Sequence, residues 1–207
     1  MPPSDTEIRA AHDRLLAETR RLIARVAPLA AMAGGALARP LAWQPRAPRA
    51  HVATRLLAPM GPAADGPTAP LVRALVEATA HLHWRNSYAP DQVGQGFLDR
   101  SAWVELVSPG GPFLCETHRV TIGFWDRGLH YPRHWHRPEE VYCVLAGSAR
   151  FETDGRADER LRAGGTRHHA PSLPHAATMD ETPLLALAIW RGEGLTEIST
   201  LCPVDDA

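Results

Sequence analysis

A histidine-rich segment between two glycines constrains this chain more than any other part of its sequence. It runs from Gly128 to Gly147 and holds His134 and His136 one residue apart, with Glu140 four positions after the second histidine. Neutral imidazole nitrogens and a carboxylate oxygen are common ligands of divalent transition metals. The segment therefore predicts a metal site, and the chemistry of the protein is expected to depend on it.

The geometry of β-strands indicates how these side chains meet one ion. Side chains alternate along a strand, so His134 and His136 face the same way, roughly 7 Å apart along the chain. On a straight strand Glu140 would lie roughly 13 Å beyond His136, out of reach of the same ion. Pro138 favours a turn, which returns Glu140 to the ion on the next strand. His175 follows a proline-rich turn and supplies a fourth ligand from the far side of a small barrel. The donor set suits Fe, Zn, Mn, Ni or Co and does not choose among them.

Four further histidines of this region fit no ligand spacing. We expect them at the surface or around the site, without contact to the metal. They are His118, His130, His168 and His169.

Composition limits the classes of partner. Lys and Arg number 22 against 23 Asp and Glu, a formal net charge of −1, so nothing favours nucleic acid or an anionic membrane. No apolar run approaches the roughly 20 residues that span a bilayer. The cysteines, Cys115, Cys143 and Cys202, form no CxxC pair, and no signal peptide is recognisable. We therefore expect free thiols, a cytoplasmic location and a small-molecule substrate.

The first part of the chain is expected to be helical. Ser4 with Glu7 three residues later is typical of a capped helix start, and apolar residues follow at helical spacing. This helix should end near Pro28 or at Gly34. A second helix is expected to begin at Pro70 and to end before residue 86.

From about residue 102 the pattern changes to short segments of apolar and β-branched residues separated by Gly, Pro and Asp turns. This pattern predicts a mainly β sandwich or barrel. We expect an α-helical extension at 1–100, packed on a β-barrel with the metal site at 101–207. The predicted strand segments are Ala102–Val107, Phe113–Trp125, His134–His136, Glu140–Thr153, Gly165–Ala170 and Leu184–Arg191.

The spacing Gly128-x5-His134-x-His136-x3-Glu140-x6-Gly147 resembles the first conserved motif of the cupin superfamily. Gly165, Pro171 and His175 resemble the second motif, although Met179 stands where an asparagine is usual. The resemblance implies a single antiparallel β-barrel with a metal near its centre. Cupins often pair their barrels, which leaves a homodimer open.

A closer resemblance is to the cupin-type dimethylsulfoniopropionate (DMSP) lyases of the DddL and DddQ kind. It rests on the run from His130 to Tyr142, on Ala146–Ala149, and on the segments His175–Met179 and Leu185–Gly192. It spans most of the chain and implies a carbon–sulfur lyase that eliminates dimethyl sulfide from DMSP and leaves acrylate.

The resemblance also implies roles for individual residues. The metal ligands would be His134, His136, Glu140 and His175. Tyr131 and Tyr142 would bind substrate or abstract its proton, and Trp190 would line the pocket, where its ring suits a sulfonium cation. We favour Tyr131 as the base, while Tyr142 remains an alternative that can instead contact the metal or the substrate carboxylate. Another mononuclear-metal cupin enzyme, such as an Fe(II) dioxygenase or an isomerase, and a non-catalytic ligand-binding cupin are the competing functions.

Overall fold

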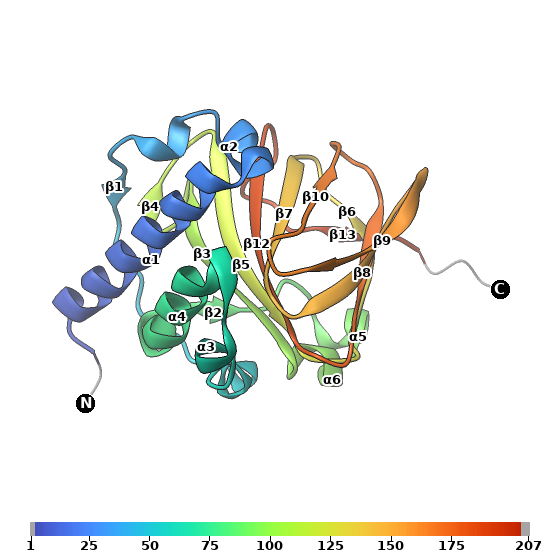
Figure 1. The fold of residues 1–207 in the computed structure, drawn as a ribbon, viewed down its shortest axis with the longest axis horizontal. Helices are drawn as coiled ribbons and strands as arrows, with labels where there is room; N and C mark the ends of the chain where they lie inside the picture. The colour runs from blue at the N-terminus through green and yellow to red at the C-terminus, as the bar shows by residue number, and fades with distance from the viewer. Residues whose placement is uncertain (1–2, 204–207) are drawn as a thin grey trace.

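The computed structural model describes residues 3–203, with most helices ahead of the main strands in the chain (Figure 1). The α-helices are α1 (Asp5–Arg25), α2 (Ala27–Ala33), α3 (Met60–Ala63), α4 (Ala69–Ala78), α5 (Pro90–Val93) and α6 (Gln95–Leu98). Short 3-10 turns lie among them, η1 (Ala36–Ala38), η2 (Val52–Leu56), η3 (Gly66–Thr68) and η4 (Thr79–His81). No helix within the described range is both long and apolar enough to cross a membrane.

The helix ends follow the sequence signals. Ser4 Oγ accepts a hydrogen bond from the Glu7 backbone N–H at 3.3 Å, and the Glu7 carboxylate accepts one from the Ser4 N–H at 2.7 Å. This reciprocal cap satisfies two N–H groups that have no partner inside α1. Both predicted end points are used: α1 stops just before Pro28, and α2 continues until Gly34, whose φ is +53°.

The strands form two sheets. The larger has eight strands, in the order β1 (Ala42–Trp43), β4 (Phe113–Leu114), β3 (Ser101–Ser108), β5 (His118–Trp125), β12 (Leu184–Arg191), β7 (Glu139–Ala146) and β10 (Thr166–His169), with β2 (Trp84–Arg85) also paired to β3. The smaller has five, in the order β13 (Thr200–Leu201), β6 (His130–Trp135), β11 (His175–Met179), β8 (Ser148–Thr153) and β9 (Arg156–Arg162). All pairs are antiparallel except β3 with β4.

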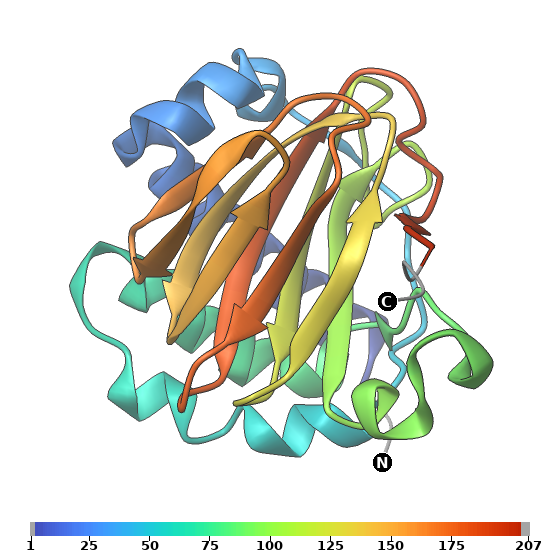
Figure 2. The same ribbon diagram turned by 90° about the vertical axis from the view of Figure 1, so that its right-hand side faces the viewer.

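The two sheets lie face to face. Helices α1 to α4 cover the outer face of the larger one, whereas α5 and α6 lie at one end of the sheets (Figures 1 and 2). A first core joins the helices to that outer face, with Leu15 of α1, Leu75 of α4 and Cys143 of β7 among its members. A second core lies between the sheets and includes Tyr142 and Phe151. Alternation along β7 thus sends successive residues to opposite cores, as its sequence predicts.

The predicted class, mainly β with an α-helical N-terminal extension, is confirmed. The β part is a two-sheet sandwich, because no ladder among residues 3–203 joins the sheets into a closed barrel. The first hundred residues also contribute β1 and β2 to the larger sheet and share its outer core. A division of the chain at residue 100 stays a prediction.

Five strands of residues 3–203 were absent from the prediction, namely the two-residue strands β1, β2 and β13 and the longer β9 and β11. The segment β9 is charged at most positions and exposed along nearly its whole length, since it is the edge of the smaller sheet and pairs only with β8. Its charge conceals the alternation on which strand prediction depends, although charged edges are how sheets avoid pairing with other chains. The segment β11 is short and alanine-rich, and its pairing with β6 and β8 makes it a strand.

Gly147 has to be glycine for two reasons. It separates β7 from β8 with a φ of +76°, and a Cβ placed there would lie 1.8 Å from the Pro183 carbonyl oxygen. We expect Gly147→Ala to lower the free energy of unfolding by about 3 kcal/mol or more, from backbone strain plus the clash. Gly155→Ala is the matched control, because its φ of +70° is similar but the space around it is open. It should cost about 1 kcal/mol in urea denaturation. An equal decrease in the free energy of unfolding for the two variants would show that the close approach of Pro183 does not contribute to the effect.

Candidate metal centre and active site

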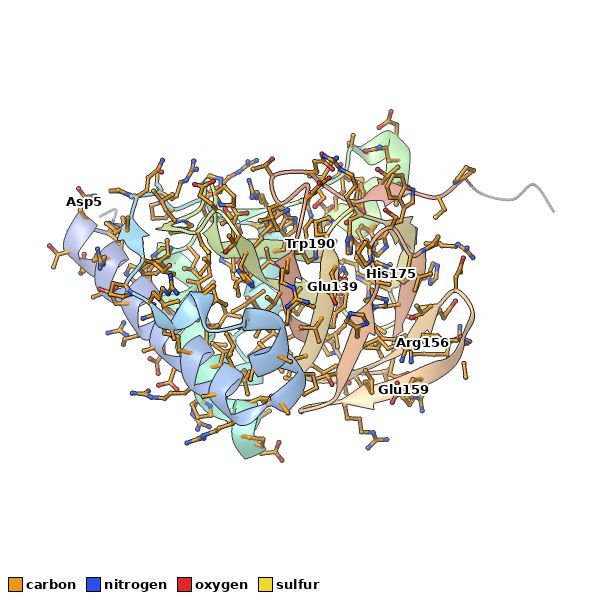
Figure 3. All side chains as sticks on the ribbon, turned by 90° about the horizontal axis from the view of Figure 1, so that it is seen from above. Asp5, Glu139, Arg156, Glu159, His175 and Trp190 are labelled. Atoms are coloured by element: carbon orange, nitrogen blue, oxygen red, sulfur yellow. The ribbon has the colours of Figure 1, made fainter. Side chains whose placement is uncertain are left out.

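Three of the predicted ligands converge between the sheets. His136 follows β6, Glu140 lies on β7 and His175 lies on β11, and their ligand atoms all lie within 4.8 Å of one another. Glu140 Oε2 is 3.1 Å from His136 Nε2 and 3.4 Å from His175 Nε2. All three side chains are buried. Figure 3 shows His175 among the strands, on the side of the molecule away from Asp5 at the start of α1. The turn predicted at Pro138 therefore does bring Glu140 back beside His136.

The histidine rings are held in one tautomer by the backbone. The Nδ1 of His134 lies 2.7 Å from the Pro132 carbonyl oxygen, that of His136 lies 2.8 Å from the Pro138 carbonyl, and that of His175 lies 2.8 Å from the Leu173 carbonyl. A carbonyl only accepts, so each Nδ1 donates, and in the neutral ring each Nε2 has a lone pair that can bind a metal. Hydrogen-bonded Nδ1 with free Nε2 is how most metal-binding histidines are oriented.

His134 stands slightly apart from the other three. Its ring lies 4.3 Å from that of His175 and 6.4 Å from that of His136, measured between centroids. It is buried, but it is outside the group whose ligand atoms lie within 4.8 Å. The structure therefore brings His134 to the site, and its place in the ligand set stays a prediction.

The cluster suits a cation. Burial would raise the pKa of Glu140, but the charge and hydrogen bond of His136, together with His175, hold it well below its usual range. Burial likewise lowers the pKa of His136, and the Glu140 carboxylate outweighs that effect and raises it. His175 Nε2 is buried and makes no hydrogen bond within residues 3–203. An ionised carboxylate beside an unpartnered imidazole nitrogen fits a divalent ion, so this His/Glu/His cluster can hold a metal.

Trp190 holds the other oxygen of the carboxylate. Its indole Nε1 donates to Glu140 Oε1 at 2.6 Å, and its ring lies 4.2 Å from that of His136. Trp190 also borders the cavity beside the cluster, and its contact with substrate stays a prediction. The Arg119 guanidinium lies 4.9 Å over the same ring, so a second cation placed there would be repelled.

An irregularity in β6 turns Tyr131 toward the site. Opposite β11, His134 pairs with His175 and Tyr131 with Ala177, so three steps on β6 match two on β11. This bulge puts Tyr131 and His134 on the same face although they are three residues apart. Their rings stack at 4.0 Å. The inward turn expected at Pro132 is thus present.

Tyr142 reaches the site from the other sheet. It lies on β7 two residues after Glu140 and faces the inter-sheet core. Burial, reinforced by the Glu140 carboxylate, raises its pKa well above the ordinary value. Burial also raises the pKa of Tyr131 well above the ordinary value. Both phenols therefore keep their protons in this environment, and an added positive charge is needed to favour the phenolate that could act as a base.

The site contains residues that sequence reasoning missed. Tyr88 lies 3.1 Å from Tyr131, oxygen to oxygen, and Trp125 stacks on Tyr131 at 5.5 Å. Arg119 borders the same cavity, whose volume is about 60 Å³. These residues come from the loop before α5 and from β5, and none of them belongs to the histidine segment. Only their contacts could have identified them.

The other histidines divide into two pairs. His130 and His168 are exposed, as expected. His118 is buried away from the cluster, and its Nε2 lies 3.1 Å from the Met32 carbonyl of α2, so the expected position is wrong for it. His169 is fully buried and stacks on His175 at 3.8 Å.

His169 predicts acid sensitivity of the metal-free protein. Burial first, and then the charge of His175, lower its pKa to about 3. In the unfolded chain His169 binds a proton at about pH 6.5, whereas in the folded protein it stays neutral. Its contribution to the free energy of unfolding is therefore present above that pH and is lost as pH falls. From about pH 7.5 to about pH 5 the loss should be about 2 kcal/mol. Urea denaturation of chelator-treated wild type and His169→Phe checks this, because phenylalanine keeps the stacked ring without the proton. An identical pH slope in both proteins would contradict it.

Comparisons with known proteins agree with this geometry. A family model for DMSP lyases matches residues 18–186. The curated DMSP lyase DddQ of Ruegeria pomeroyi is 37% identical over 120 residues, which are 58% of this chain and 60% of that relative, so the match spans less than two thirds of its length. The fold is similar to a chain from the crystal structures of DMSP lyases RdDddP and RnDddQII, with TM-score 0.88, 38% identity, and coverage of 95% of this chain and all of that one. It is also similar to the crystal structure of DddQ from Ruegeria pomeroyi, with TM-score 0.85, 34% identity, and coverage of 93% and 96%. The chain belongs to the DMSP lyase family.

Proposed function

We propose that this protein is a metal-dependent lyase that converts DMSP to dimethyl sulfide and acrylate. The observation that carries the proposal is the buried cluster of His136, Glu140 and His175 with two tyrosine phenols facing the same space, in a chain of this family. A carboxylate–imidazole cluster beside phenols and aromatic walls suits removal of a weakly acidic proton and departure of a sulfonium group as a neutral sulfide.

The metal would be held by His136, Glu140 and His175, with His134 as the further predicted ligand. A divalent ion of Fe, Zn, Mn, Ni or Co would polarise the substrate carboxylate and lower the pKa of nearby acids. Trp190 keeps Glu140 in place through its indole N–H, and the backbone carbonyls keep the imidazole rings in place.

Proton abstraction is assigned to Tyr131. Its phenol lies outside the three-residue ligand cluster, so it can reach the substrate from a side that the metal would not occupy. It is also hydrogen-bonded to Tyr88. From the phenolate form of Tyr131, the α-proton passes to the Tyr131 oxygen, the electron pair of the α C–H bond forms the C=C bond, and the C–S pair leaves with sulfur. The products are acrylate, neutral dimethyl sulfide and the proton held by tyrosine. Tyr142, beside Glu140, is the alternative base, and its other role is to contact the metal or the substrate carboxylate.

The substrate cation needs an aromatic receptor because a sulfonium has no hydrogen-bond donors. Trp190 lines the cavity, as proposed for substrate binding, but Arg119 already lies over its ring. Trp125 and Tyr131 therefore suit the sulfonium better, while Trp190 forms a wall of the pocket.

We further propose that the protein acts in the cytoplasm on this small molecule, without nucleic acid or membrane as partner, and that it forms a homodimer. Residues 1–100 then serve as a helical extension and 101–207 as the metal-binding unit. Size-exclusion chromatography with light scattering tests the assembly.

Headspace analysis tests the activity directly. Purified protein loaded separately with each candidate metal is incubated with DMSP, and both dimethyl sulfide and acrylate are measured. The two products are expected in equal amounts. His136→Ala is the control and should release neither product. Release without oxygen consumption excludes the dioxygenase alternative. No release with any of the five metals sinks the substrate assignment.

A further inference from the structure

Arg119 is a buried cation at the edge of the proposed active site. It lies on β5, is 5% exposed, and borders the same cavity as Glu140, Tyr142 and Trp190. A buried guanidinium is costly unless it is paired and hydrogen-bonded. The elimination proposed above gives Arg119 no role, although it lies beside the reacting groups.

The protein satisfies only part of this guanidinium. Nε lies 2.9 Å from Glu105 Oε1, and Nη1 donates to the Glu197 backbone carbonyl at 2.7 Å. Although that carboxylate is near, the Nε N–H is buried and makes no hydrogen bond within residues 3–203. A guanidinium carries five N–H donors in a planar fork that matches a carboxylate. Donors therefore remain for a ligand in the cavity.

Two indole rings lie beside the guanidinium. Its central carbon lies 4.9 Å over Trp103 and 4.9 Å over Trp190. These ring contacts restrict the side chain before any ligand binds, so binding of an anion costs it little further freedom.

The other side of the site has the opposite preference. A neighbouring hollow is lined by His134 and His175 of the site and by a wall that includes Trp125, Tyr131, Phe151 and Met179. This wall is aromatic and apolar. It suits a sulfonium before bond cleavage and the neutral sulfide afterwards. A molecule with an anionic and a cationic end is thus matched in one direction only.

We propose that Arg119 binds the carboxylate of the substrate and sets the direction in which a sulfonium carboxylate enters the site. The assignment rests on the proposed function for the identity of the substrate. Its direct claim is that the cavity is a receptor for carboxylates that carry a cation a few bonds away. Neutral amides or esters of the same cation are excluded because they leave Arg119 without an anion.

Arg85 provides a matched control on the same wall. It lies 4.0 Å over Trp103 and pairs with Glu105 at 3.0 Å, so it shares two partners with Arg119. It lines a separate outer hollow with His83 and Pro112 and does not reach the active-site cavity. Arg85→Met removes the same charge and the same kinds of contact without touching the substrate.

The test measures binding of two half-substrates to the metal-loaded protein by calorimetry. Propionate carries the carboxylate and trimethylsulfonium carries the cation. Arg119→Met is expected to weaken propionate binding about 10- to 100-fold, the usual effect of losing a hydrogen bond to a charged group. Trimethylsulfonium binding should stay the same or become tighter, and Arg85→Met should bind both probes as wild type does. Metal content, measured in parallel, reports whether the cluster is intact.

The outcomes separate the two proposals. Unchanged propionate binding in Arg119→Met, equal weakening of both probes, or equal losses in Arg119→Met and Arg85→Met would each overturn the role of Arg119. If the methionine variant does not fold, Arg119→Lys replaces it, and its propionate binding should be weaker than wild type because lysine lacks the planar fork. Unchanged binding there also overturns the role. Wild type that binds propionate through Arg119 but releases no dimethyl sulfide from DMSP overturns the lyase assignment alone.

Discussion

Exchanging Glu140 for glutamine is expected to abolish stable metal binding, and turnover should fall in proportion to the metal lost. Glu140 is 1% exposed and is the one carboxylate in the three-residue cluster. The glutamine amide has the same shape as the carboxylate but no negative charge. Where its NH₂ group faces the Trp190 indole N–H, two donors meet and no hydrogen bond forms. Replacing even an outer partner of a metal ligand usually costs 10- to 100-fold in affinity, so loss of a ligand should cost roughly 100-fold or more.

Metal content by mass spectrometry after dialysis measures this effect, with thermal unfolding as a second readout. Added metal should raise the Tm of wild type, because a ligand that binds only the folded state stabilises it. It should leave the Tm of Glu140→Gln unchanged. Glu139→Gln is the matched control, since the neighbouring carboxylate binds Arg191 and His168 on the outer side. A glutamine variant at 140 that retains one metal per chain would refute the ligand assignment.

The variant Tyr131→Phe, which lacks only the hydroxyl group, is expected to lower kcat by roughly 100- to 10,000-fold, the range typical of a lost general base. Metal content should not change, because Tyr131 stacks on His134 through its ring and phenylalanine keeps that ring. Tyr142→Phe separates the alternatives. If Tyr142 contacts the metal or the carboxylate, its variant should bind substrate or metal more weakly and keep a larger share of kcat.

Steady-state kinetics of both variants, with metal content for each, decide between the tyrosines. Tyr88→Phe adds information, since Tyr88 is hydrogen-bonded to Tyr131 and to no ligand of the cluster. Its loss should reduce kcat less than the loss of Tyr131. Full turnover in Tyr131→Phe, with loss in Tyr142→Phe, would transfer the role of base to Tyr142.

Prediction from sequence succeeded where local pattern decides structure. The strand at Leu184–Arg191 matches β12 at both ends, because an apolar run between turns is buried on both faces. The turn at Pro138 and the break at Gly147 follow from the backbone preferences of those residues. The edge strand β9 was missed because its pairing, and not its apolar content, makes it a strand.

The site was predicted as far as its motif extends. The spacing of His136, Glu140 and His175 was sufficient to bring them together. Arg119 and Tyr88 belong to no motif, and they meet the cluster only because the sheet and the loop before α5 place them there. The inward position of Tyr131 depends on a bulge whose partner strand, β11, was itself missing from the prediction.

The carbonyl bonds that orient the imidazoles have a consequence for the entropy of metal capture. Two of the acceptors belong to Pro132 and Pro138, and the third, Leu173, directly precedes a proline. Proline fixes its own φ and restricts the residue before it, so these oxygens are stiffly placed once the chain has folded. The rotational freedom of the rings is thus already lost during folding, before any ion arrives. Residues that never touch the ion thereby raise its affinity, and an exchange of one of these prolines would loosen the site while leaving every ligand in the sequence.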